Sequence, residues 1–120
     1  MKISWITIYV KNMEESKRFY CYVLGLKIKT EMAPRPGMKI CFLDGETIDY
    51  ELIEGVDKRD AKIGEGISVA FLVKSLDDKI QDLKEKGVEN IVGPIQPTPN
   101  IRFIFIQDPN GMTIQIAEHL

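Results

Sequence analysis

The chain has 120 residues, of which 44% are hydrophobic and 28% charged, and its formal net charge at pH 7 is −2. This length suits one compact domain that buries a substantial core. The nearly balanced charge excludes the basic footprint of a nucleic-acid or anionic-membrane binder, and no apolar run approaches a bilayer span. Strand-like residues open the sequence in place of a signal peptide, so we expect a cytoplasmic protein.

The two cysteines, Cys21 and Cys41, form neither a CxxC motif nor a recognisable metal-binding spacing. Thiols of this kind in a cytoplasmic protein are usually reduced and mostly buried, and we expect this of both. A Cys21–Cys41 disulfide is the alternative.

The first half of the chain is predicted to form a strand, a helix and three more strands. In order, these elements occupy residues 3–10, 13–24, 26–32, 38–43 and 47–54. The first strand alternates with period two, which indicates two different faces. Asn12 stands three residues before Glu15, a capping spacing, and Gly25 marks the helix end. The break "APRPG" and the turn at Asp44-Gly45 separate the strands.

The second half repeats this design. The stretch "SVAFLVKSLDDKIQDLKEKG" (68–87) follows the plan of "WITIYVKNMEESKRFYCYVLG" (5–25) at an offset of 63. Ser75 and Asp78 recreate the helix cap, and Gly87 recreates the stop. The repeat therefore predicts a second strand followed by a second helix.

The closing strands complete the repeat. Strands are predicted at 90–95 and 101–107, around the proline-rich break "QPTPN", and in "DPNGMTIQIAE". Gln115 matches Glu51 at an offset of 64. We therefore predict two β-α-β-β-β modules, 1–60 and 61–120, within a single domain, because neither half has enough core to stand alone.

These features resemble the vicinal oxygen chelate superfamily, which includes glyoxalases, bleomycin-resistance proteins, extradiol dioxygenases and methylmalonyl-CoA epimerases. The resemblance rests on "FY-x-x-VLGL" after the first strand, on "DYELIEG", and on "DPNG" before the last strand, and it covers nearly the whole chain. It implies an α+β fold whose two modules form an open, curved sheet around a shared cleft.

In metal-binding members of that superfamily, the ligands come from the first and last strands of each module. By position, those sites fall here on Trp5, Glu51, Ser68 and Gln115. Only Glu51 keeps the family's residue type, since an indole cannot ligate and hydroxyl and amide groups ligate weakly. The single histidine, His119, is next to last in the chain. A catalytic first-row metal needs about three imidazole, carboxylate or thiolate ligands, so we expect no metal and no other cofactor.

Strand alternation places aromatic and polar side chains on the expected cleft face. The candidate ligand-binding residues are Trp5, Thr7, Tyr9, Asp49, Glu51, Ser68 and Gln115. Such a mixture suits a small-molecule pocket, while the opposite, apolar face is expected to pack under the helices.

Plainer interpretations of these residues stay open. Trp5 could fill the cleft as core. Glu51 could be solvated, or paired with Arg35 or Arg102. Ser68 and Gln115 could hydrogen-bond only to each other.

We therefore expect a metal-independent small-molecule-binding protein of the glyoxalase/bleomycin-resistance type, with an aromatic or planar ligand. The resemblance also implies a homodimer; we expect no nucleic-acid or membrane partner. The alternative is a lyase or isomerase of the glyoxalase/epimerase type that uses Glu51 as its catalytic base, with or without a divalent metal. A third possibility is an interaction module whose cleft is filled.

Overall fold

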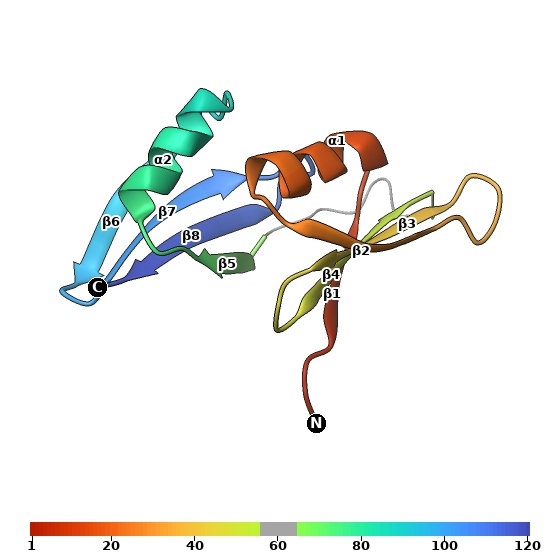
Figure 1. The fold of residues 1–120 in the computed structure, drawn as a ribbon, viewed down its shortest axis with the longest axis horizontal. Coiled ribbons are helices and arrows are strands. Elements are labelled where there is room, and N and C mark those ends of the chain that lie inside the picture. The colour runs from red at the N-terminus through yellow and green to blue at the C-terminus, as the bar shows by residue number, and fades with distance from the viewer. Residues whose placement is uncertain (56–64) are drawn as a thin grey trace. The chain divides into compact units, whose positions relative to one another are not determined.

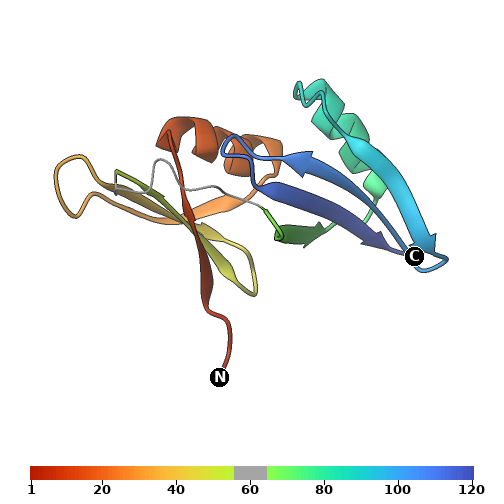
Figure 2. The same cartoon turned by 180° about the vertical axis from the view of Figure 1, so that it is seen from behind.

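The computed structural model describes residues 1–55 and 65–120 and divides the chain into two compact units, Met1–Ala61 and Lys62–Leu120. Each unit has one four-stranded sheet with helical structure against one face (Figures 1 and 2). The α+β class and the two β-α-β-β-β modules are thereby confirmed. The predicted boundary between residues 60 and 61 lies outside the described residues, and the shared cleft remains a prediction.

The first unit follows the predicted order of elements. They are β1 (Trp5–Tyr9), α1 (Met13–Lys17), the π-helical segment η1 (Arg18–Val23), β2 (Lys27–Met32), β3 (Lys39–Asp44) and β4 (Asp49–Glu54). The sheet order is β1-β4-β3-β2, and β1 runs parallel to β4. The first and last strands of the module therefore lie side by side, which brings their side chains together.

The first helix differs from its prediction in its second half. After Lys17 it widens into a π-helix, in which the Leu24 N–H donates to the Phe19 carbonyl at 3.0 Å. Phe19, Tyr20 and Val23 are buried there. Sequence spacing missed this change because apolar residues three and four apart fit either winding. Gly25, with φ of 85°, ends the helix as predicted.

The second unit repeats the same arrangement. Its elements are β5 (Ser68–Leu72), α2 (Leu76–Glu85), β6 (Val92–Thr98), β7 (Ile101–Gln107) and β8 (Thr113–His119). The order is β5-β8-β7-β6, with β5 parallel to β8. No helix within residues 1–55 and 65–120 has the length and hydrophobicity to cross a bilayer.

Backbone hydrogen bonds reproduce the repeat at the offsets read from the sequence. The Val10 N–H donates to the Ile53 carbonyl at 2.8 Å, and the Val73 N–H donates to the Ala117 carbonyl at 2.9 Å. The donors differ by 63 (73 − 10) and the acceptors by 64 (117 − 53). The two modules therefore join their first and last strands in the same register.

Both predicted helix caps form. The Asn12 side chain accepts from the Glu15 N–H at 2.9 Å, and the Ser75 hydroxyl accepts from the Asp78 N–H at 3.2 Å. Each cap satisfies one of the four N–H groups that a helix start leaves without an intrahelical partner, which fixes where the helix begins.

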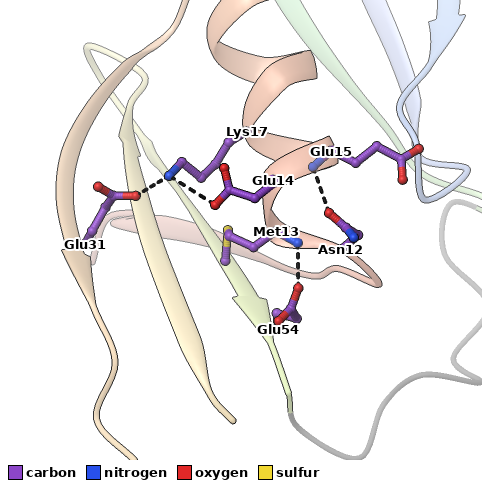
Figure 3. Close-up of polar contacts among 7 residues, drawn as sticks. All are labelled: Asn12, Met13, Glu14, Glu15, Lys17, Glu31 and Glu54. Atoms are coloured by element: carbon purple, nitrogen blue, oxygen red, sulfur yellow. Dashed lines mark hydrogen bonds and ion pairs between the residues drawn. The ribbon is translucent and has the colours of Figure 1, made fainter. Parts of the chain in front are cut away.

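Polar contacts attach α1 to its sheet at both ends (Figure 3). At the start, the Met13 N–H donates to the Glu54 carboxylate of β4 at 2.7 Å. Near the end, Lys17 pairs with Glu31 of β2 and lies 3.7 Å from Glu14. The hydrogen bond to Glu31 raises the pKa of Lys17. These contacts hold the helix over one face of the sheet.

The apolar cores lie on the helix-facing sides of the two sheets. In the first unit, buried sheet residues are Ile8, Cys41, Leu43, Tyr50 and Leu52. On the helix-facing side of the second sheet they are Ile104, Ile106, Ile114 and Ile116, with Leu76 and Leu83 from α2. The Tyr20 and Tyr50 rings lie 5.1 Å apart at the helix–sheet contact. Because the helices cover one face of each sheet, the polar and aromatic side chains that alternate with the core residues lie on the opposite face.

One strand boundary in the second unit was wrong. The break predicted at 96–100 is narrower, because β6 continues through Pro94 and Pro97 to Thr98. This strand is the edge of its sheet and its register with β7 is irregular. An edge strand tolerates proline because the missing N–H does not interrupt a ladder on both sides.

Both thiols are free, and Cys41 is buried whereas Cys21 is half-buried. Burial raises the pKa of Cys41 from 9.0 to about 11. The folded state therefore holds this proton more tightly than the unfolded chain. Its contribution to stability is full below about pH 9 and is lost as the pH rises to about 11.

We accordingly expect the free energy of unfolding to fall between about pH 9 and about pH 11. Urea titrations at several pH values measure this. In the Cys41→Ala variant the fall should be shallower, because one of the titrating groups is gone. An identical pH slope in the variant and the unsubstituted protein would contradict the assignment.

Candidate functional site

The face of the first sheet opposite α1, here named the aromatic face, carries the sequence-predicted residues of the first module. Trp5, Thr7 and Tyr9 of β1 lie in parallel register with Asp49, Glu51 and Ile53 of β4. Paired residues on neighbouring strands share a face of the sheet. Trp5 is 55% exposed and Tyr9 is 37% exposed. The parallel pairing therefore brings aromatic and acidic side chains onto one surface.

Glu51 is held by a neighbour on this face. The Thr7 hydroxyl donates to Glu51 Oε1 at 2.7 Å. Arg102, one of the partners considered for Glu51, instead pairs with Asp77 at 3.1 Å and lies 3.8 Å from Glu118. The carboxylate is therefore oriented by a neutral hydroxyl.

Asp49, unlike Glu51, has a basic side chain as its hydrogen-bond partner. Lys29 donates to Asp49 Oδ2 at 2.8 Å, and this hydrogen bond lowers the pKa of the carboxyl. Lys29 sits where the register of β2 shifts between Ile28 and Thr30, a β-bulge that re-aims a side chain. The negative charge of Asp49 is therefore balanced by the positive charge of Lys29 in an ion pair at the surface.

Two contributors to the aromatic face were not predicted. Phe42 of β3 pairs with Glu51 across the sheet, and its ring stands edge-on to that of Trp5, with centroids 6.1 Å apart. Lys29 is the second, through its pairing with Asp49. Alternation in "MKICFL" predicts the face of the sheet on which Phe42 lies. Only the register of β3 with β4 shows that Phe42 is the neighbour of Glu51.

The second sheet places Ser68 and Gln115 on the face opposite α2. Ser68 pairs with Thr113, and Gln115 lies between Ala70 of β5 and Phe105 of β7. Ser68 is exposed and Gln115 is half-buried. The register puts Gln115 two positions further along its strand than the residue facing Ser68, so the two are diagonal neighbours.

The four positions that correspond to the superfamily's metal sites do not form a suitable donor set. Trp5 offers only an N–H donor, Ser68 a neutral hydroxyl and Gln115 an amide. Glu51 alone is anionic, and Thr7 occupies one of its oxygens. Within residues 1–55 and 65–120, no group of three or more His, Cys, Asp or Glu side chains could hold a metal ion. The residues present therefore do not fit a divalent metal.

The sequence matches one family model over almost its whole length. The model of the Glyoxalase/Bleomycin resistance protein/Dioxygenase superfamily matches residues 2–116. Among curated proteins, the uncharacterized protein YwkD of Bacillus subtilis is 30% identical over 122 aligned positions, covering 97% of this chain and 95% of YwkD.

Solved structures share the fold at lower identity. TnmS3, an antibiotic binding protein from Streptomyces sp. CB03234, aligns over 100% of this chain and 97% of its own, with a TM-score of 0.78 and 19% identity. The fosfomycin resistance protein FosX from Listeria monocytogenes covers 100% of this chain and 94% of its own, with a TM-score of 0.80 and 17% identity. The family match, the matching folds and the duplicated module agree. The chain belongs to the glyoxalase/bleomycin resistance protein/dioxygenase superfamily.

Proposed function

We propose that this chain is a metal-independent small-molecule-binding protein of the glyoxalase/bleomycin-resistance type, and that its ligand is aromatic or planar. The observation that carries the proposal is the exposure of Trp5 on the aromatic face, beside Phe42 and the Thr7–Glu51 pair. Aromatic walls with a few placed polar groups are typical of small-molecule sites. Trp5 and Tyr9 would contact the plane of the ligand, and Glu51 would fix its orientation.

The donor set supports the proposal that binding is independent of a metal. One carboxylate, one amide and one hydroxyl supply neither an imidazole nor a second anion, so the affinity for a first-row metal would be low. The antibiotic-binding neighbour TnmS3 supports a binding role for this fold. The proposed ligand-binding residues are Trp5, Thr7, Tyr9, Asp49 and Glu51 in the first unit, and Ser68 and Gln115 in the second unit. A homodimer is part of the same proposal.

Fluorescence titration tests the proposal, because Trp5 is the only tryptophan in the chain. A panel of neutral, cationic and anionic naphthalene derivatives should include compounds that change the Trp5 emission. Calorimetry of the Trp5→Ala variant should then show at least a tenfold loss of affinity, since truncating an aromatic anchor typically costs about 2 kcal/mol.

Two controls accompany this titration. Trp5→Phe removes the signal but keeps an aromatic ring, so it should bind more tightly than Trp5→Ala. Leu72→Ala removes another exposed apolar side chain, from β5, and reports on non-specific apolar binding. The absence of binding across the whole panel would overturn the proposal in favour of an interaction module.

The hydrogen bond from Thr7 also keeps the lyase or isomerase alternative testable, because a catalytic base must be positioned. In that case Glu51→Gln would abolish proton exchange at a carbon next to a carbonyl while leaving substrate binding largely intact. In a pure binding protein no such exchange occurs in the unsubstituted chain.

A further inference from the structure

The two carboxylates of the aromatic face have different charge balances. Asp49 is paired with Lys29 at 2.8 Å. Glu51 receives its hydrogen bond from the uncharged Thr7, and no Lys or Arg side chain among residues 1–55 and 65–120 forms an ion pair with it. Its second oxygen, Oε2, has no protein donor within that part of the chain. The described residues of this face therefore leave one negative charge uncompensated.

Aromatic rings stand next to this charge. Phe42 is the cross-strand neighbour of Glu51 on β3, and Trp5 meets Phe42 edge-on across β4. Trp5 and Phe42 offer negative ring faces, and so does Tyr9, four residues beyond Trp5 on β1. A positively charged group is attracted both by these faces and by a carboxylate. The surface is complementary to a cation attached to a planar ring, and it would repel an anion.

We propose that the ligand of this site belongs to the class of aromatic ammonium or amidinium compounds, with the cation bound at Glu51 Oε2 and the ring against Trp5. This inference rests on the proposed function and adds the charge of the ligand to it. Thr7 is a positioning residue, because its hydroxyl holds Oε1 and turns Oε2 toward the ligand. Glu51 is the residue that determines specificity.

Three isosteric probes test the charge. They are 2-naphthylmethylammonium, 2-naphthylmethanol and 2-naphthoate, titrated by calorimetry at low and high salt. The ammonium compound should bind at least tenfold more tightly than the alcohol, and the naphthoate should bind most weakly. Only the affinity of the ammonium compound should fall clearly as salt is added.

Variants assign the effect to Glu51. Glu51→Gln keeps an acceptor for Thr7 but removes the charge, so the ammonium compound should bind no better than the alcohol. Glu15→Gln, an exposed change on α1, alters the net charge equally and should leave the preference intact. Thr7→Val should reduce the preference, and Thr7→Ser should restore it.

The outcomes separate this inference from the proposed function. Equal binding of all three probes, unchanged in Glu51→Gln, would overturn the inference while leaving an aromatic-binding protein. Preference for the naphthoate would overturn it as well. Loss of the preference in Glu15→Gln would also contradict it, because net charge alone would then explain the effect. Binding of none of the probes by a folded protein would count against both.

Discussion

Replacement of Leu52 with alanine is expected to lower the free energy of unfolding by about 2–5 kcal/mol, the usual cost of removing a fully buried leucine side chain. Leu52 has no exposed surface and lies in β4 between Ile8 of β1 and Cys41 of β3. The alanine leaves a cavity at the centre of the first core. Urea unfolding followed by circular dichroism measures the change.

The duplicated module supplies a matched variant. Ile116 occupies the equivalent position in β8, 64 residues further on (116 − 52), and it is 1% exposed. If the chain is a single domain, Leu52→Ala and Ile116→Ala should shift one common transition. A second transition that Leu52→Ala leaves in place would show that the units unfold separately. Leu72→Ala, at a 64% exposed position, should change stability by no more than about 0.5 kcal/mol.

Gly55→Ala is expected to destabilise the protein through the backbone. Gly55 has φ of 94°, and an added Cβ would lie 1.9 Å from the Gly37 carbonyl oxygen. Both atoms belong to or are fixed by the main chain, so neither can rotate away. The loss of free energy of unfolding should exceed the cost of an ordinary residue in the left-handed region, which is about 1–2 kcal/mol.

Gly25→Ala is the control for this change. Gly25 has a similar φ of 85°, but nothing lies within 4 Å of the added Cβ. It should therefore show the conformational cost alone, and the difference between the two variants measures the clash. Equal losses of stability would mean that the backbone around Gly37 moves aside.

The architecture could be predicted from the sequence because two copies of one pattern support each other. The caps at Asn12 and Ser75 and the stop at Gly25 depend on local chemistry, which a sequence states directly. The offsets of 63 and 64 recur in the backbone hydrogen bonds that join the first and last strands of each module. Local rules were insufficient where two windings share a spacing, as in η1, or where an edge strand tolerates proline, as in β6.

The candidate site was harder to predict because its properties depend on neighbours across strands. Alternation places Glu51 on the right face, but it does not show that Thr7 binds it or that Phe42 stands beside it. Asp49 and Glu51 look alike in the sequence. They differ in their partners, because the bulge in β2 places Lys29 beside Asp49. The local sequence does not indicate this bulge.

The parallel pairing of β1 with β4 has a consequence for how the protein folds. Trp5 meets its partner Asp49 only after the chain has passed through the helix and the hairpin between them. Closure of such a long loop is entropically costly and slow compared with hairpin formation. The surface that we assign to ligand binding is thus absent from any early, locally ordered intermediate, and Trp5 emission during refolding reports the moment at which it is assembled.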